Sequence, residues 1–166
     1  MPNATFEISS PCDEKTCLQV VPELGTGGVE RGTIEIAKTL VEHGWRSLVA
    51  SSGGPRVREL ERIGAEHLTL PLQAKNPMVM RKNARRLADL IKVRDIDLIH
   101  ARSRAPAWSA FYASQETGCP LITTFHGAYS LGPLGLKKAY NRVMTRGVRI
   151  IAISDFIANH IEKEYG

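Results

Sequence analysis

A cluster of glycines is the first feature of this sequence that suggests chemistry. Gly25, Gly27 and Gly28 stand between an apolar run and an amphipathic stretch in the segment PELGTGGVERGTIEIAKTL (22–40). Glycines at such a junction let the backbone approach a ligand closely, and the helix that follows offers free N–H groups and its positive dipole end. This combination suits a phosphate group, although the spacing matches neither the P-loop nor the GxGxxG dinucleotide pattern. The alternative is a turn that only closes a strand onto a helix.

A second candidate is the basic segment HARSRAP (100–106), which contains His100, Arg102, Ser103 and Arg104. Two arginines at the end of a strand can hold a carboxylate or a phosphate in a bidentate manner. The alternative is a solvated basic loop, with the histidine packed against the end of the strand.

A third candidate is His126, which precedes Gly127 in TTFHGAYS (123–130). A histidine at this place can donate a hydrogen bond to a substrate hydroxyl or stabilise charge in a transition state, whereas a lone histidine is more often structural. The histidines at positions 43, 67, 100, 126 and 160 show no metal-ligand spacing such as HExxH. We therefore expect no metal site.

All three candidates follow apolar runs in a repeating strand–helix pattern. The predicted strands are 17–21, 47–51, 66–72, 96–101, 120–125 and 148–154. The predicted helices are 29–44, 55–64, 76–95, 105–118, 136–147 and 154–166. Such alternation predicts an α/β fold, a Rossmann-like three-layer sandwich with a mainly parallel sheet. Ligands of these sheets bind at the carboxyl ends of the strands, near the switch in strand order.

Helical periodicity also predicts which faces are buried. For helix 29–44 the predicted buried residues are Val29, Thr33, Ile36, Ala37 and Leu40. For helix 76–95 they are Met80, Ala84, Leu87, Ala88 and Ile91. Gly44 is a predicted helix stop and Ser154 a predicted N-cap. The basic residues 81, 82, 85 and 86 lie mostly off the buried stripe; they are compatible with acidic lipid headgroups or nucleic acid, or with an ordinary solvated face.

Composition sets the broad class of protein. The 166 residues fit one domain, and 43% hydrophobic with 23% charged residues is ordinary for a globular chain. The net charge of +5 is compatible with an anionic ligand, a membrane surface or nucleic acid, but 6% aromatic residues argue against stacking on single strands. Three irregularly spaced cysteines argue against a disulfide framework and favour a reducing, cytoplasmic setting. Residues 1–16 are predicted to be a flexible tail without the features of a signal peptide.

Taken together, the motifs resemble a known family. The segments GGVER, DLIHARS, TTFHG and IIAISDFIANHI, in this order and spacing, resemble the N-terminal domain of the family-4 retaining glycosyltransferases. These enzymes have the GT-B fold, in which two Rossmann-like domains face each other across a cleft. The resemblance covers about residues 17–166 and implies that this chain is one half of such an enzyme.

The resemblance also implies roles for individual residues. Gly27, Gly28 and Gly127 are expected at the diphosphate and sugar of a nucleotide-sugar donor, and His126 at the donor sugar as the catalytic residue. The acceptor-side candidates are Glu30, Arg31, His100, Arg102, Ser103 and Arg104. Many relatives have a second histidine where this chain has Arg102, and an arginine favours a more acidic acceptor.

The family's second domain, which supplies the nucleotide pocket and a Glu-x7-Glu motif, has no counterpart in this sequence. We therefore expect the chain alone to be inactive and to need the C-terminal donor domain. The implied activity is transfer of a hexose, with retention and without a metal, to a glycan or glycolipid acceptor of envelope polysaccharide or lipopolysaccharide synthesis. The expected location is cytoplasmic, with peripheral contact to an anionic membrane and no nucleic acid. The alternative is a non-catalytic α/β module that binds a phosphorylated small molecule.

Overall fold

Six parallel strands form a single sheet in the order β3-β2-β1-β4-β5-β6. The structure is a computed structural model that describes residues 14–130, 132 and 136–166. The strands are β1 (Thr16–Val20), β2 (Arg46–Ser51), β3 (Glu66–Thr69), β4 (Leu98–Ala101), β5 (Leu121–Phe125) and β6 (Arg149–Ala152). The helices are α1 (Gly28–Glu42), α2 (Val57–Arg62), α3 (Pro77–Arg94), α4 (Arg104–Thr117), α5 (Leu136–Asn141) and α6 (Asp155–Tyr165).

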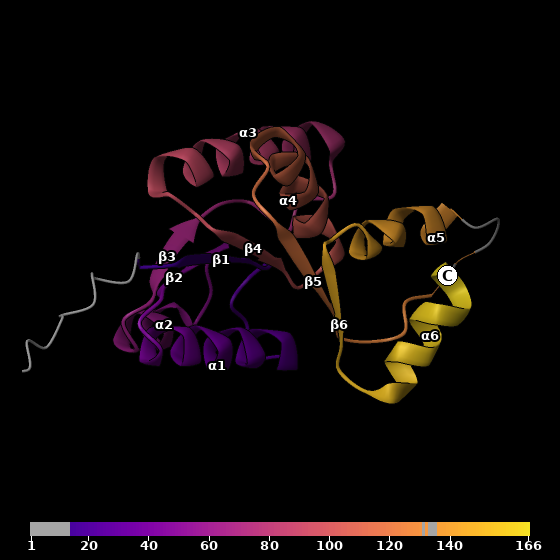
Figure 1. Ribbon diagram of the computed structural model, residues 1–166, viewed down its shortest axis with the longest axis horizontal. Helices are drawn as coiled ribbons and strands as arrows, with labels where there is room; N and C mark the ends of the chain where they lie inside the picture. Colours follow the sequence, from indigo (N-terminus) through magenta and orange to yellow (C-terminus); the bar gives the residue numbers. More distant parts are fainter. Residues whose placement is uncertain (1–13, 131, 133–135) are drawn as a thin grey trace, which may run out of the picture.

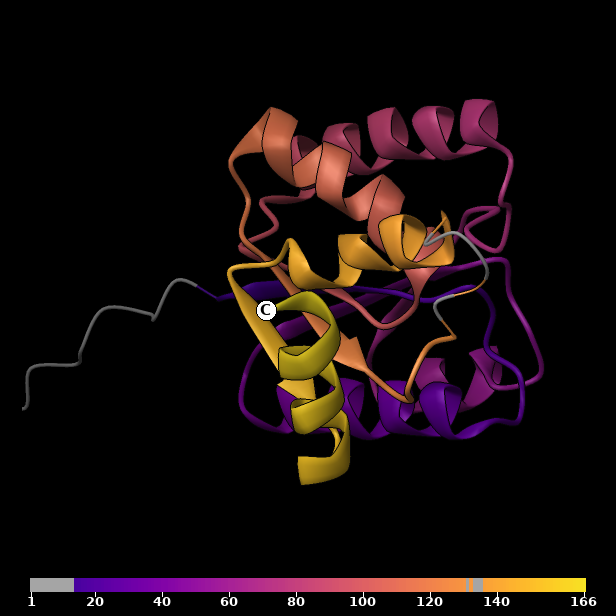
Figure 2. The same ribbon diagram turned by 90° about the vertical axis from the view of Figure 1, so that its right-hand side faces the viewer.

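Helices cover both faces of the sheet. Figure 1 shows α1 and α2 on one face and α3 and α4 on the other, and in Figure 2, the view turned by 90°, the sheet again lies between these two layers. Two apolar clusters correspond to the two faces, one around Ile34 and Leu60 and a larger one around Leu87 and Phe125. The predicted Rossmann-like three-layer α/β fold is thus confirmed.

Local capping explains where several helices begin. Asn76 caps α3 by accepting a hydrogen bond from the N–H of Met78 at 2.9 Å, and Pro77 occupies the first helical position. Ser154 caps α6 as predicted, accepting from the N–H of Ile157 at 3.3 Å. The first helix, α1, ends at Glu42, and Gly44 follows with a positive φ of 76°.

Several details differ from the sequence predictions. On α1, Val29 and Leu40 of the predicted buried face are only half-buried. Ile36 is 39% exposed and Ile34 is buried in its place, because apolar residues at both positions left the buried face of α1 ambiguous. The predicted helix 136–147 is α5 followed by a 3₁₀ turn, Arg142–Thr145. Gly147, just before β6, lies close to β5: a Cβ on it would lie 2.7 Å from the carbonyl oxygen of Leu121.

At the N-terminal end, strand β1 begins at Thr16, one residue before the predicted strand. The rest of the predicted tail falls largely on residues 1–13, and with Cys12 it lies outside the described residues. Cys17 and Cys119 are free thiols, and burial raises their pKa to about 12 and about 11. None of the helices that the structure describes combines the length and apolar character of a membrane span.

Candidate functional site at the carboxyl edge of the sheet

The strand order switches between β1 and β4, so the segments after these strands meet at one edge of the sheet. The first of them is the glycine loop. Gly27 is the N-cap of α1 and, as a glycine, has no side chain that could cap the helix. A Cβ at Gly27 would lie 2.5 Å from Oε2 of Glu30, whereas an ideal Cβ on Gly28 meets no described atom within 4 Å. The start of α1 therefore offers backbone N–H groups that have no partner within the helix, with open space beside Gly28 and the carboxylate of Glu30 against Gly27.

His100 lies at the carboxyl end of β4 and is 3% exposed. Its Nε2 is 2.7 Å from the hydroxyl of Thr124 on the neighbouring strand β5. Burial, followed by the charges of Arg102 and His126, lowers the pKa of His100 to about 3. The imidazole is thus neutral at pH 7, and its hydrogen bond fixes its orientation.

Arg102 follows β4 and is also buried, with 6% of its surface exposed. Its Nη1 donates to Oε1 of Gln19 at 3.3 Å, and the Gln19 amide in turn donates to the carbonyl of Thr33 in α1 at 3.0 Å. Its Nε has no hydrogen-bond partner among the residues that the structure describes, and none of the ion pairs found there includes Arg102. Burial lowers the pKa of Arg102, and the charge of Glu35 opposes that shift. A guanidinium cation without a bound carboxylate thus lies beside the second turn of α1.

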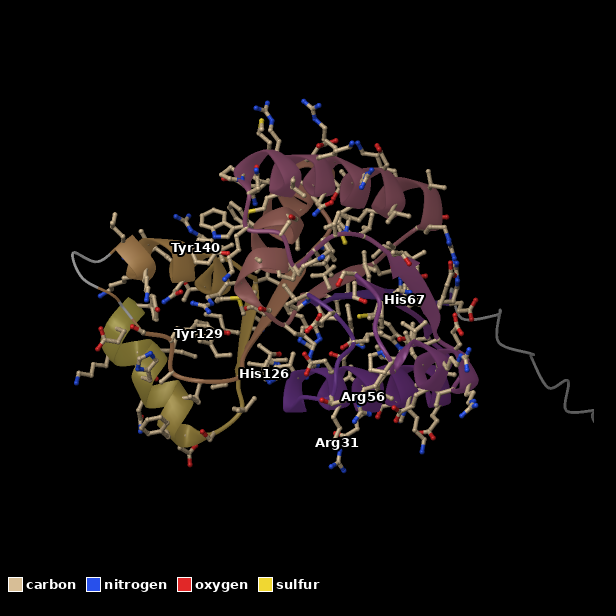
Figure 3. All side chains as sticks on the ribbon, turned by 180° about the vertical axis from the view of Figure 1, so that it is seen from behind. Arg31, Arg56, His67, His126, Tyr129 and Tyr140 are labelled. Atoms are coloured by element: carbon tan, nitrogen blue, oxygen red, sulfur yellow. The ribbon has the colours of Figure 1, made fainter. Side chains whose placement is uncertain are left out.

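His126 directly follows β5 and is half-buried. Figure 3 shows it close to the beginning of α1. Burial, followed by the charge of Arg102, lowers the pKa of His126 to about 4, so its ring is also neutral at pH 7. Its Nε2 is buried and has no partner within the described part of the chain. Such an atom is available to bind a ligand.

The structure separates the other candidates into different environments. Arg104 turns away from Arg102: its Nη1 donates to Oδ1 of Asn141 at 3.0 Å, and its guanidinium lies 4.5 Å from the ring centre of Tyr129. Arg31 is exposed and pairs with Glu35 at 3.0 Å. Ser103 is the N-cap of α4 without a side-chain hydrogen bond to that helix. The two arginines of HARSRAP therefore do not act as one clamp.

Gln19 and Thr124 belong to this site and were not predicted. Both are buried, Gln19 against Arg102 and Thr124 against His100. A signal exists in the sequence, because a glutamine inside the apolar run CLQVV needs a polar partner when buried.

The arrangement combines neutral imidazoles, one cation and free N–H groups of a helix start. It suits hydroxyl groups and an anion. Among the described residues, no group of three or more His, Cys, Asp or Glu side chains is placed to hold a metal ion.

Comparison with known proteins places these features in a family. Residues 26–166 match the family model described as Glycosyltransferase Family 4. A crystal structure of a glycosyltransferase from Rickettsia africae is 43% identical with a TM-score of 0.77; the match covers 90% of this chain and 39% of that one. Among curated proteins the comparison found no match.

Two further structures resemble the chain at lower identity and show the fold alone. HepE from Anabaena, in complex with UDP and glucose, is 22% identical with a TM-score of 0.69, and the match covers 90% of this chain and 41% of HepE. The lipopolysaccharide outer core galactosyltransferase WaaB is 14% identical with a TM-score of 0.66, and the match covers 92% and 43%. The chain thus spans about two fifths of these proteins, as expected for one Rossmann-like half of a GT-B fold.

Proposed function

Because the chain belongs to glycosyltransferase family 4, we propose that it is the acceptor-side half of an enzyme that transfers a hexose, with retention, from a nucleotide sugar to a glycan or glycolipid. The observation that carries this proposal is the buried, unpartnered Nε2 of His126 beside the open start of α1. A sugar hydroxyl is a suitable partner for that nitrogen, and a diphosphate suits the helix start.

For the donor side, we propose that the backbones of Gly27, Gly28 and Gly127 approach the diphosphate and sugar. The lack of any described atom within 4 Å of a Cβ on Gly28 leaves room for that approach. The structure of HepE with UDP-glucose supports a nucleotide sugar as the donor. The dipole of α1 and basic side chains would stabilise the leaving diphosphate, so we propose that no metal is needed.

For the acceptor side, the proposal rests on Arg102. A buried cation without a carboxylate partner favours an acceptor that carries a carboxylate or a phosphate. His100 would fix the geometry beside it, while Glu30 and Ser103 stand at the starts of α1 and α4, where they can reach acceptor hydroxyls. An acidic acceptor agrees with a role in envelope polysaccharide or lipopolysaccharide synthesis, which the likeness to WaaB also supports.

We also propose peripheral contact with an anionic membrane at the cytoplasmic face. Lys82 and Arg86 are exposed on α3, and none of the ion pairs found among the described residues includes either side chain. Each basic residue near an anionic surface contributes about 1 kcal/mol of attraction. Sedimentation with phosphatidylglycerol vesicles should show weaker binding of K82Q/R86Q; equal binding of neutral and anionic vesicles would refute the contact.

The catalytic proposal is tested on the polypeptide isolated from its source cells, whose intact mass shows whether a donor domain is joined to these residues. We expect His126→Ala to lower turnover of a nucleotide sugar by about 100-fold or more, while circular dichroism stays unchanged. Proton NMR of the anomeric hydrogen gives the anomeric configuration of the product, and comparison with the donor tests retention. Unchanged turnover would remove His126 from the mechanism, and sugar-phosphate binding without any transfer would favour the binding-module alternative.

A further inference from the structure

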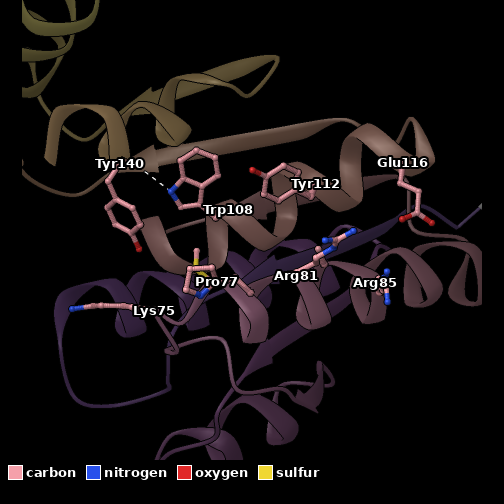
Figure 4. A pocket seen from close by; sticks show the side chains of 10 residues that line it. Lys75, Pro77, Arg81, Arg85, Trp108, Tyr112, Glu116 and Tyr140 are labelled. Atoms are coloured by element: carbon pink, nitrogen blue, oxygen red, sulfur yellow. Dashed lines mark hydrogen bonds between the residues drawn. The ribbon is translucent and has the colours of Figure 1, made fainter. Parts of the chain in front are cut away.

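A cavity lies between α3 and α4, and its lining includes none of the residues assigned to the carboxyl-edge site. Its volume is about 870 Å³, within the range of small-molecule sites. Figure 4 shows Trp108 and Tyr112 together on α4, with Arg81 and Arg85 of α3 across from them and Tyr140 of α5 at one end. The cavity therefore has one aromatic wall and one basic wall.

The aromatic wall has a fixed geometry. The rings of Trp108 and Tyr112 are stacked, with centroids 5.9 Å apart and an interplanar angle of 29°. The indole N–H of Trp108 donates to the carbonyl of Tyr140 at 3.1 Å, which holds the ring in place. Tyr112 is 52% exposed, so a broad aromatic face is already formed and accessible.

Several polar groups of the cavity lack a partner among the described residues. None of the ion pairs found among the described residues includes Lys75, Arg81 or Arg85. The hydroxyl of Tyr140 is buried without a hydrogen-bond partner in the same part of the chain. Glu116, the one carboxylate of the lining, is paired with Lys92 at 2.9 Å. The cavity thus has an excess of positive charge and a hydroxyl group without a partner.

We propose that this cavity binds an acidic oligosaccharide, a stretch of the acceptor glycan that lies outside the reacting end. The C–H face of a sugar ring packs on an exposed aromatic side chain, and sugar hydroxyls satisfy a buried phenol. Arginines suit a carboxylate or phosphate on the sugar. Only the identification of the occupant as the acceptor rests on the proposed function; the binding site itself does not.

Intrinsic tryptophan fluorescence can report this binding. Its two tryptophans are Trp45 and Trp108, and only Trp108 lines the cavity. In a Trp45→Phe background, tetragalacturonate should therefore change the fluorescence of Trp108 in a saturable way. Maltotetraose, which has the same length but no charge, should bind at least about tenfold more weakly.

Substitutions on α3 and α4 distinguish sugar binding in this cavity from the membrane contact. We expect R81Q/R85Q to raise the dissociation constant for tetragalacturonate about tenfold or more, and Tyr112→Ala to raise it several-fold. K82Q/R86Q is the matched control, because these residues are exposed on the same helix but do not line the cavity. It should leave the constant unchanged.

Three results would overturn the inference. The first is no saturable response to tetragalacturonate, and the second is equal affinity for maltotetraose. The third is that R81Q/R85Q weakens binding to phosphatidylglycerol vesicles but leaves tetragalacturonate binding unchanged. The last would assign the basic wall to a lipid surface. None of these results bears on His126, so failure here is distinguishable from failure of the proposed transferase activity.

Discussion

Arg102 and Gly32 are in contact across the site: a Cβ built on Gly32 would lie 2.8 Å from Nη2 of Arg102. The helix α1 thus passes over the guanidinium at the one point in its second turn where no side chain intervenes. The conformational freedom of Gly32 is not needed here, because this glycine lies inside the helix. Its role is to leave space for the arginine.

The first prediction concerns Gly32→Ala. Alanine stabilises a helix interior by about 1 kcal/mol relative to glycine, and this gain offsets the cost of moving the end of a long side chain. We expect the free energy of unfolding in urea to change by less than about 1 kcal/mol. The NMR signals of the Gln19 side-chain amide should nevertheless shift, because Arg102 donates to it. A loss of several kcal/mol would instead mean that the guanidinium cannot move.

The second prediction concerns the coupling between Arg102 and His126. The positive charge of Arg102 lowers the pKa of His126, after the larger effect of burial. Arg102→Gln should therefore raise the pKa of His126 above about 4, although burial keeps it below the ordinary histidine value. NMR titration of the histidine ring protons measures this shift.

The control for this titration is Arg104→Gln, because Arg104 faces Asn141 and Tyr129 and is not among the causes of the His126 shift. It should leave the pKa of His126 where it is. If Arg102→Gln and Arg104→Gln raise the pKa of His126 equally, the specific effect of the Arg102 charge on His126 is refuted.

The third prediction concerns stability against pH. The pKa of His100 is about 3 in the folded chain, against 6.5 as its ordinary value. Between these values the unfolded state binds a proton that the folded state does not, so stability is complete above pH 6.5 and falls as the pH falls. For His100 this loss is about 1–2 kcal/mol between pH 7 and pH 5.

His100→Gln removes this titration while keeping a side chain that can bond to Thr124. The variant should be less stable than the wild type at pH 7, and the difference should shrink toward pH 5. Urea denaturation at both pH values measures it, and carboxylates titrate equally in both proteins. A difference that is constant with pH would show that His100 has the same pKa in the folded and unfolded chains.

The sequence predicted the fold well where the pattern was unambiguous. All five residues predicted to be buried on helix 76–95 are buried, because the charged residues at 81, 82, 85, 86 and 89 mark the opposite, exposed face of that helix. On α1, either Ile34 or Ile36 could have been the buried residue. Packing against α2 and β2 buries Ile34 and leaves Ile36 exposed. Periodicity alone could not make that choice.

The candidate site was predictable only as a set of segments. Alternation of strands and helices places the residues after β1, β4 and β5 at one edge, but it does not give side-chain directions. Arg102 and Arg104 are two residues apart, yet one is buried against Gln19 and the other reaches α5. The contact with Gly32 depends on how α1 crosses the sheet, which no local pattern contains.

The last prediction separates a structural role of Arg104 from an acceptor-binding one. Asn141 is fully buried; its Oδ1 accepts from Arg104 and its amide donates to the carbonyl of Ser130 at 3.1 Å. Arg104→Ala would leave that buried oxygen unpaired and remove the cation from the ring of Tyr129, so we expect a loss of about 1–3 kcal/mol in the free energy of unfolding. Arg104→Lys keeps a donor and a cation and should recover part of this loss. If Arg104→Ala unfolds at the wild-type urea concentration, the arginine does not join α4 to α5, and its place on the acceptor side becomes the better explanation.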